Sequence, residues 1–237
     1  MPISYAHYDL HNGFIHNWLV AGPQAIPVDI ERFAGDDFKQ RIAQSYYEAK
    51  SGITKMPVER GPLTEGIFKV GNYTGSWSYF SCREDHFVDQ SATYLTCHYL
   101  RSWAYTQVIS ETAQDVLFVL TTHGPVDVWL NGKHVHRQEH FRDQHLAGTS
   151  FKVRLKKGTN KLLVRFEGVA IRECPHAMAL QVCRFSNRQR STKRKKVEPF
   201  LPAAGVHVRI PTLIKSISRR NEFEQVSATV YMDRDVF

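Results

Sequence analysis

The chain has few of the residues and patterns that mark metal-binding, membrane or secreted proteins. Only four of its 237 residues are cysteines, and they form no C-x-x-C pair and no zinc-finger spacing. No run approaches the roughly 18 apolar residues that a membrane-spanning helix needs. No basic region followed by an apolar region marks a secretory signal at the start. We therefore expect reduced thiols, no membrane partner and a cytoplasmic location.

Catalytic motifs are also missing from the sequence. There is no G-x-S-x-G elbow and no glycine-rich phosphate loop. Glycoside hydrolysis normally needs two positioned carboxylates, and neither Glu139 nor Asp143 has an acidic partner in a recognisable frame. Cys97 and His98 are adjacent, so on a strand they would face opposite sides. We expect no catalytic residue, no metal and no cofactor in this chain.

The positive charge is concentrated in one segment. The formal net charge is +8, and seven basic residues with no acid among them lie between Arg184 and Lys196, which leaves +1 for the rest. This segment could contact phosphates in a salt-dependent way, but no aromatic residues alternate with its charges. We expect no nucleic-acid partner, and keep nucleic-acid association through residues 184–196 as an alternative function.

Hydrophobic residues make up 42% of the chain and aromatic residues 12%, which is ample for a buried core. One helix is expected within residues 29–52, capped by Asp36 or Asp37. Phe38, Ile42 and Tyr46 recur at helical spacing and form a narrow apolar stripe, which predicts a helix on the surface of a larger body.

The rest of the pattern predicts short antiparallel strands. Residues 116–120 are continuously apolar, which predicts a strand buried on both faces. Residues 126–130 and 133–136 flank Asn131-Gly132, the pair that a type I′ hairpin turn requires. A further hairpin turns at residues 157–160. The fold class we expect is all-β, an antiparallel jelly-roll β-sandwich with one short surface helix.

The change in composition after Val182 suggests three regions. We assign residues 1–185 to the sandwich and residues 186–199 to a basic linker. Residues 200–237 contain two alternating patterns, which either return to the sandwich or begin a second domain. We favour the start of a second, truncated β domain.

Residues 126–166 resemble the galactose-binding-domain-like jelly roll. The string from Val128 to Val135, the loop through Phe141 and the Gly158-Thr159-Asn160 turn are similar to those in the N-terminal sugar-binding domains of β-galactosidases and β-glucuronidases. Asn17-Trp18-Leu19-Val20-Ala21-Gly22-Pro23 looks like the opening strand of such modules, although Gln24 replaces their usual Phe. The resemblance implies a non-catalytic carbohydrate-binding or structural accessory module of a larger glycoside-hydrolase-like protein, with a separate catalytic domain as its partner.

Aromatic side chains are the candidate carbohydrate-binding residues, because sugar C–H faces stack on Trp and Tyr. Trp77 and Tyr79 follow a turn-like segment, and Trp103 lies on a second strand. Arg137 and His140, at or beyond the Asn-Gly hairpin, could add hydrogen bonds to sugar hydroxyls. We expect at least one of Trp77 and Trp103 to be a surface platform, although each could equally fill the core.

A metal-dependent, cupin-like enzyme is the alternative from another class. His134 and His136 stand two residues apart, and Glu139 follows them. Imidazole and carboxylate together suit Zn or Fe. The gap from His136 to Glu139 is shorter than in cupins, so this hypothesis depends on whether the three side chains converge.

Overall fold

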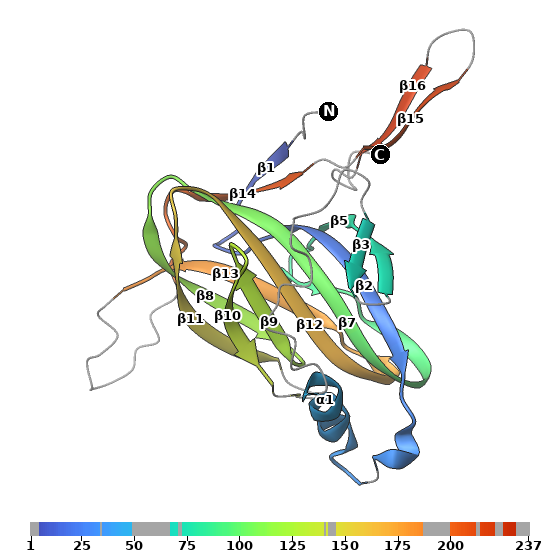
Figure 1. Cartoon of the computed structure of the whole chain (residues 1–237). Coiled ribbons are helices and arrows are strands. Elements are labelled where there is room, and N and C mark those ends of the chain that lie inside the picture. The colour runs from blue at the N-terminus through green and yellow to red at the C-terminus, as the bar shows by residue number, and fades with distance from the viewer. Residues whose placement is uncertain are drawn as a thin grey trace, which may run out of the picture.

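The computed structural model describes residues 5–33, 35–48, 67–70, 73–139, 141, 146–186, 200–211, 214–220 and 225–230. These residues form an antiparallel β-sandwich with one α-helix, which confirms the expected fold class (Figure 1). No helix in the described part of the chain is long and apolar enough to cross a membrane. All four cysteines are buried, and none of them forms a disulfide.

We call the larger sheet, with eight strands, sheet A and the four-stranded sheet facing it sheet B. Sheet A contains β1 (Tyr5–Asp9), β2 (Asn17–Pro27), β5 (Ser78–Ser81), β7 (Ala92–Ser110), β9 (Val126–Leu130), β10 (Lys133–Gln138), β12 (Gly158–Cys174) and β14 (Val206–Pro211). Sheet B contains β6 (Val88–Asp89), β8 (Gln114–Thr122), β11 (Ala147–Leu155) and β13 (Ala177–Arg184). Two separate hairpins pair β3 (Ile67–Val70) with β4 (Tyr73–Ser76), and β15 (Ile214–Arg220) with β16 (Gln225–Val230).

The main core lies between the two sheets. Alternate residues of β7, β9 and β12 point into it and meet the inward residues of β8 and β13. In β8, Val116, Phe118 and Leu120 are buried while the residues between them are only partly buried. The expectation that residues 116–120 are buried on both faces is therefore wrong. It is β7, β9 and β12 of sheet A that are buried on both faces.

The Asn131-Gly132 hairpin is present, but the hairpin expected at residues 157–160 is wrong, because β11 and β12 on either side of that turn lie in sheet B and sheet A. The two turns nevertheless contact each other. Asn131 and Gly132 have positive φ angles of 54° and 81°, as a type I′ turn needs, and Gly158 has φ of 84°. The Asn131 side chain donates from Nδ2 to Asn160 Oδ1 over 3.0 Å and accepts from the Lys161 amide over 3.0 Å. The two turns thus lock the same end of β9 and β12.

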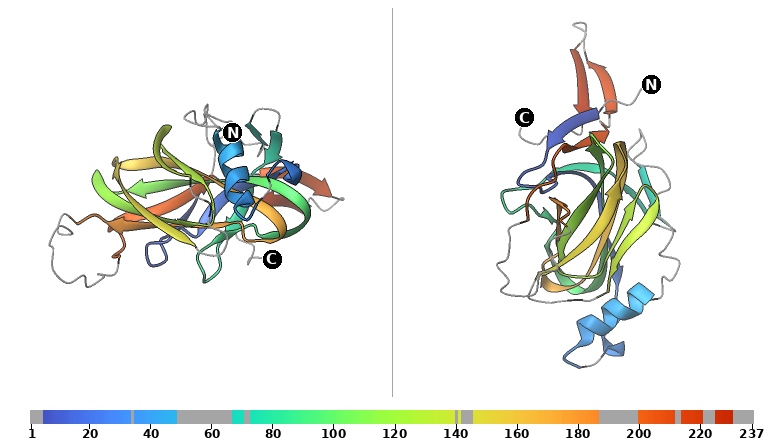
Figure 2. Two further views of the ribbon diagram at one scale, coloured as in Figure 1. Left: turned by 90° about the horizontal axis from the view of Figure 1, so that it is seen from below. Right: turned by 90° about the vertical axis from the view of Figure 1, so that its left-hand side faces the viewer.

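The region in which one helix was expected, residues 29–52, contains a 3-10 turn followed by an α-helix. A short 3-10 turn, η1 (Ile30–Arg32), precedes α1 (Phe38–Glu48), and Gly35 between them has a positive φ of 112°. Ile42 is fully buried, and Phe38 and Tyr46 pack with it against Tyr99 and Val169 of sheet A. The predicted surface helix is therefore present, at one end of the sandwich (Figure 2). Gly52, where the sequence suggests that the helix ends, lies outside the described residues.

The C-terminal region returns to the sandwich in part. β14 pairs antiparallel with β7, from Val206 opposite Ser110 to Arg209 opposite Gln107, and also with β1. The assignment of these residues to a second domain is therefore wrong, because their alternating side chains complete sheet A. Most of the expected basic linker, residues 187–199, lies outside the described residues.

His176 is a buried titratable group at the edge of the core. Its Nε2 lies 2.9 Å from Ser102 Oγ, and its ring lies 4.7 Å from the ring of Phe166. Burial lowers the pKa of His176 from 6.5 to about 3. The folded protein therefore holds this imidazole neutral, whereas the unfolded chain protonates it below about pH 6.5.

We predict that acid destabilises the fold through His176. Because its pKa is lower in the folded state, stability is retained above pH 6.5 and is lost as the pH falls towards 3. Protonation of His176 in the unfolded chain should lower the free energy of unfolding by roughly 3 kcal/mol between pH 7 and pH 4. Urea unfolding across this range should show a smaller loss for His176→Gln than for the parent chain. His7→Gln, at an exposed position, is the control; equal losses in all three proteins would refute the prediction.

Candidate functional site

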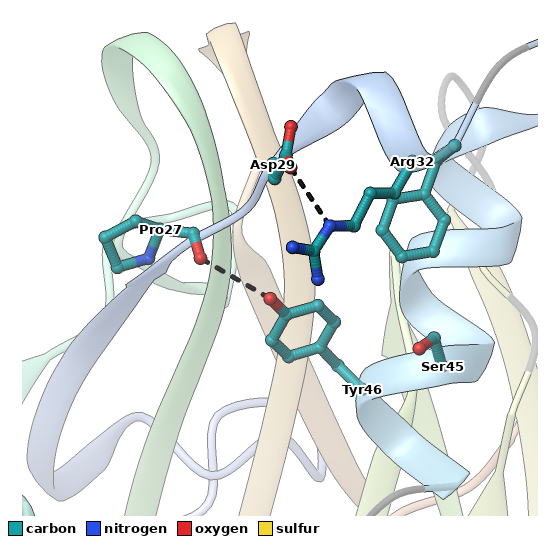
Figure 3. A pocket seen from close by; sticks show the side chains of 6 residues that line it. Pro27, Asp29, Arg32, Ser45 and Tyr46 are labelled. Carbon is teal, nitrogen blue, oxygen red and sulfur yellow. Dashed lines mark hydrogen bonds and ion pairs between the residues drawn. The ribbon is translucent and has the colours of Figure 1, made fainter.

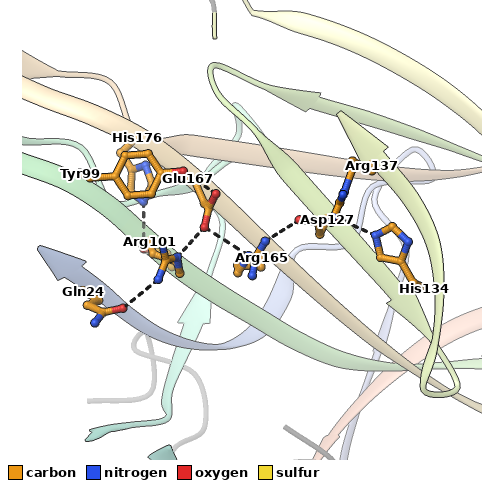
Figure 4. A network of polar contacts seen from close by, with 10 residues as sticks. Gln24, Tyr99, Arg101, Asp127, His134, Arg137, Arg165, Glu167 and His176 are labelled. Carbon is orange, nitrogen blue, oxygen red and sulfur yellow. Dashed lines mark hydrogen bonds and ion pairs between the residues drawn. The ribbon is translucent and has the colours of Figure 1, made fainter. Parts of the chain in front are cut away.

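The outer face of sheet A, which points away from sheet B, carries the most concentrated polar chemistry in the described residues. Strand register places Ala21, Trp103, Arg165 and Asp127 side by side on β2, β7, β12 and β9. Arg101 and Glu167 pair in the row two residues further along β7 and β12. Figure 4 shows the resulting chain of contacts, which runs from Gln24 to His134.

Glu167 is one centre of this ionic network. Its carboxylate accepts hydrogen bonds from Arg101 Nε and Tyr99 Oη, each over 2.5 Å, and lies 3.4 Å from Arg165 Nε. Burial, followed by the Glu167 charge, raises the pKa of Tyr99 well above its usual value, so the hydroxyl remains a donor. Arg101 also donates to Gln24 Oε1 over 3.4 Å.

Asp127 is the second centre of the network. It accepts from Arg165 Nη2 over 2.5 Å, lies 2.7 Å from His134 Nε2, and accepts from Arg137 Nε over 3.1 Å. Both the Asp127 and the Glu167 side chain have zero exposure. Arg165 joins the two carboxylates, so each is neutralised by partners within the protein and neither faces solvent. This arrangement holds strands together, and it offers a substrate no free carboxylate at these two positions.

The predicted aromatic residues lie on the same outer face, in a second apolar cluster. Trp77 and Trp103 are fully buried, and Tyr79 is 3% exposed. They pack with Leu19, Tyr105, Trp129, Leu163 and Ile210. Neither indole therefore forms the expected exposed platform, because the outer face is covered here. Sugar binding by these aromatic residues stays a prediction.

The two polar candidates have different outcomes. Arg137 is half-buried and belongs to the ionic network through Asp127. It lies beside Asp127 and Glu139. His140 lies outside the described residues.

The cupin-like alternative fails on geometry. His134 turns to Asp127, whereas the ring of His136 stacks on Phe151 with centroids 4.0 Å apart. Glu139 points to Arg137 instead, with 3.9 Å between its Oε1 and Arg137 Nη1. A register shift in β10 between His134 and His136 explains why the two imidazoles separate. The described residues contain no group of three potential ligands arranged around a metal.

An open hollow lies between the end of β2 and α1 (Figure 3). Its volume is about 320 Å³, and it is lined by Pro27, Asp29, Arg32, Phe33, Ser45 and Tyr46. Asp29 accepts from Arg32 Nε over 3.0 Å, and both side chains are largely exposed, at 54% and 79%. Tyr46 stacks on Tyr99, with ring centroids 4.9 Å apart, and donates to Pro27 O over 3.4 Å.

The sequence contains one signal for the ionic network and one for the turn beside the hollow. Arg165 and Glu167 alternate with Val164 and Phe166, and charged residues inside an otherwise apolar strand indicate a buried pair or a covered face. Asp29, three residues before Arg32, is typical of a capped turn. No signal in the sequence identified which surface would be hollow.

Comparisons with known proteins give weak structural likenesses. No protein-family model and no curated protein sequence matches the chain. A β-glucosidase from Kluyveromyces marxianus is similar at 16% identity and TM-score 0.30, over 38% of this chain and 12% of that one. A family 35 carbohydrate-binding module from Clostridium thermocellum is similar at 13% identity and TM-score 0.28, over 41% and 87%. The PA14 domain of an antifreeze protein, MpAFP, is similar at 9% identity and TM-score 0.31, over 88% and 93%.

We predict that the ionic network stabilises the fold strongly. Asp127→Asn removes one charge from a fully buried set and leaves Arg165 without its closest partner, so it should cost roughly 3–5 kcal/mol. Asp115→Asn is the matched control, since Asp115 pairs with Lys152 and Arg154 on the exposed side of sheet B and should cost much less. Equilibrium unfolding in urea measures both, and equal losses would show that the buried network adds no stability.

Proposed function

We propose that this chain is a non-catalytic carbohydrate-binding module, and that the hollow between β2 and α1 takes the sugar. The observation that carries this proposal is the composition of the hollow, in which two aromatic residues, Phe33 and Tyr46, stand beside a carboxylate and a guanidinium. Aromatic rings offer the C–H faces of a sugar an apolar surface, and Asp29 and Arg32 offer its hydroxyls an acceptor and donors.

The position of the hollow supports this role. Both of its charged side chains, Asp29 and Arg32, are largely exposed, so a ligand reaches them without displacing core residues. Tyr46 is held in place by Tyr99 behind it and by Pro27, so its ring loses little freedom on binding. The buried carboxylates Asp127 and Glu167 are committed to the ionic network. The catalytic residues of a parent enzyme would then belong to a separate domain.

A structural role within a larger protein is the second candidate. Phe200 and Leu201 are 42% and 60% exposed, where the chain approaches β14. Adjacent exposed apolar side chains of this kind favour contact with another domain. In that case the sandwich would serve as a packing partner, and no sugar would bind.

We predict that oligosaccharides of one class raise the melting temperature of the chain saturably. A ligand present at one hundred times its Kd stabilises the folded state by about 2.7 kcal/mol. Ser45→Arg should fill the hollow and weaken binding at least tenfold, measured by thermal shift and calorimetry. Gln44→Arg places the same charge at the neighbouring exposed position of α1, outside the lining, and should bind as the parent does.

The outcomes separate the candidates. Loss of binding in Ser45→Arg alone supports the hollow as the site. Binding that survives Ser45→Arg would place the sugar elsewhere, with the predicted residues Trp77, Tyr79 and Trp103 next to be tested. No response to any sugar would favour the structural role.

A further inference from the structure

Two histidines meet at a point that neither the core nor the hollow uses. His16 immediately precedes β2, and His86 lies in the connection between β5 and β6. Nε2 of His16 faces Nδ1 of His86 at hydrogen-bonding range. His16 is 8% exposed, and the exposed His11 ring lies 4.5 Å from it, centroid to centroid.

Backbone contacts hold the first imidazole in position. Asn12 and Gly13 have positive φ angles of 50° and 86°, and His11 and Phe14 exchange two backbone hydrogen bonds across them. This tight hairpin is anchored to β13, because the Val182 amide donates to Gly13 O over 2.7 Å. His16 O then accepts from the Cys82 amide over 2.8 Å, which ties it to the segment that carries the second imidazole.

His86 is held in an unusual conformation. Its φ is +67°, a left-handed conformation that residues other than glycine adopt uncommonly and that histidine tolerates better than most. Its amide donates to Arg83 O over 3.0 Å, and its ring stacks on Phe14 with centroids 4.2 Å apart. The local structure therefore points the ring nitrogen of His86 at His16 rather than into solvent.

We infer that His16 and His86 form a binding site for a divalent transition-metal ion of the Zn²⁺, Ni²⁺ or Cu²⁺ type. Imidazole nitrogen is a preferred ligand of these ions. Two nitrogens at bonds of about 2.0–2.1 Å to one tetrahedral ion stand about 3.3 Å apart, so a small opening of the pair admits the metal.

We assign the remaining coordination positions to water. No three potential ligands among the described residues are already arranged around one point, so the site uses two protein ligands and water. His11 is the third candidate, because it is exposed and already touches His16. The site is independent of the proposed sugar site, so the two proposals succeed or fail separately.

We predict that the full chain, stripped with EDTA and free of sugar, binds Zn²⁺ with a saturable rise in melting temperature and one ion per chain. Co²⁺ should give a visible absorption band under the same conditions. His86→Asn removes the imidazole while keeping a residue that tolerates positive φ, so it should fold normally and weaken Zn²⁺ binding at least tenfold. His11→Asn should weaken it by a smaller factor.

The matched control is a second histidine pair at the surface. His7 and His207 lie on β1 and β14 with ring centroids 5.7 Å apart, and His7→Asn should leave Zn²⁺ binding unchanged. Loss of binding in His7→Asn with retention in His86→Asn would overturn the proposal. No Zn²⁺ or Co²⁺ binding by the parent chain would also overturn it, and would leave the two imidazoles as a hydrogen-bonded pair only.

Discussion

Burial of sheet A on both faces is the constraint on which the rest of the structure depends. β7 and β12 pair along nearly their whole length, from Gly158 opposite Ser110 to Cys174 opposite Ala92. One face of these strands forms the core with sheet B, and the other is covered as well. Alternation of apolar and polar residues along a strand normally separates core from solvent. Here both sets of side chains must be satisfied inside the protein.

Three groups of side chains bury the outer face of sheet A. At one end aromatic side chains pack together around Trp103, and at the other α1 covers Tyr99 and Val169. Between them lies the ionic network, where Arg165 links Asp127 to Glu167. A charge buried without a partner costs several kcal/mol, so the acids and arginines of neighbouring strands are usable only as a set. A shift in the strand register would therefore leave these charges buried without their partners.

Much of the fold could be predicted from local sequence patterns, but the burial of the outer face of sheet A could not. Asn131-Gly132 and Gly158 specify turns through positive φ, which is a property of a few adjacent residues. Phe38, Ile42 and Tyr46 predict a helix for a similar reason. The period of a strand tells which residues share a face, but not what lies on that face. At least one of Trp77 and Trp103 was therefore expected at the surface, whereas both are buried.

The pairing of strands that are far apart in the sequence could not be predicted for the same reason. β14 alternates like any edge strand, and nothing local shows that it pairs with β7. The Asn12-Gly13 turn has the same signature as Asn131-Gly132, and would have identified the hairpin that positions His16. Its partner His86 is seventy positions away in the chain. Contacts of this separation are determined by the assembled sheets.

The locked interior also explains where ligands would meet the protein. Side chains along the middle of sheet A are committed to one another, and replacing any one of them disturbs its neighbours. Residues in the connections between strands contribute less to the stability of the core, so their side chains can vary in chemistry. The hollow of Asp29, Arg32 and Tyr46 is built from the turn and the helix that follow β2, and His16 and His86 lie in connections between strands. Each set is tied to a rigid strand by backbone or ring contacts. A rigid sandwich therefore positions these side chains precisely, and such positioning is what recognition of a sugar or a metal ion requires.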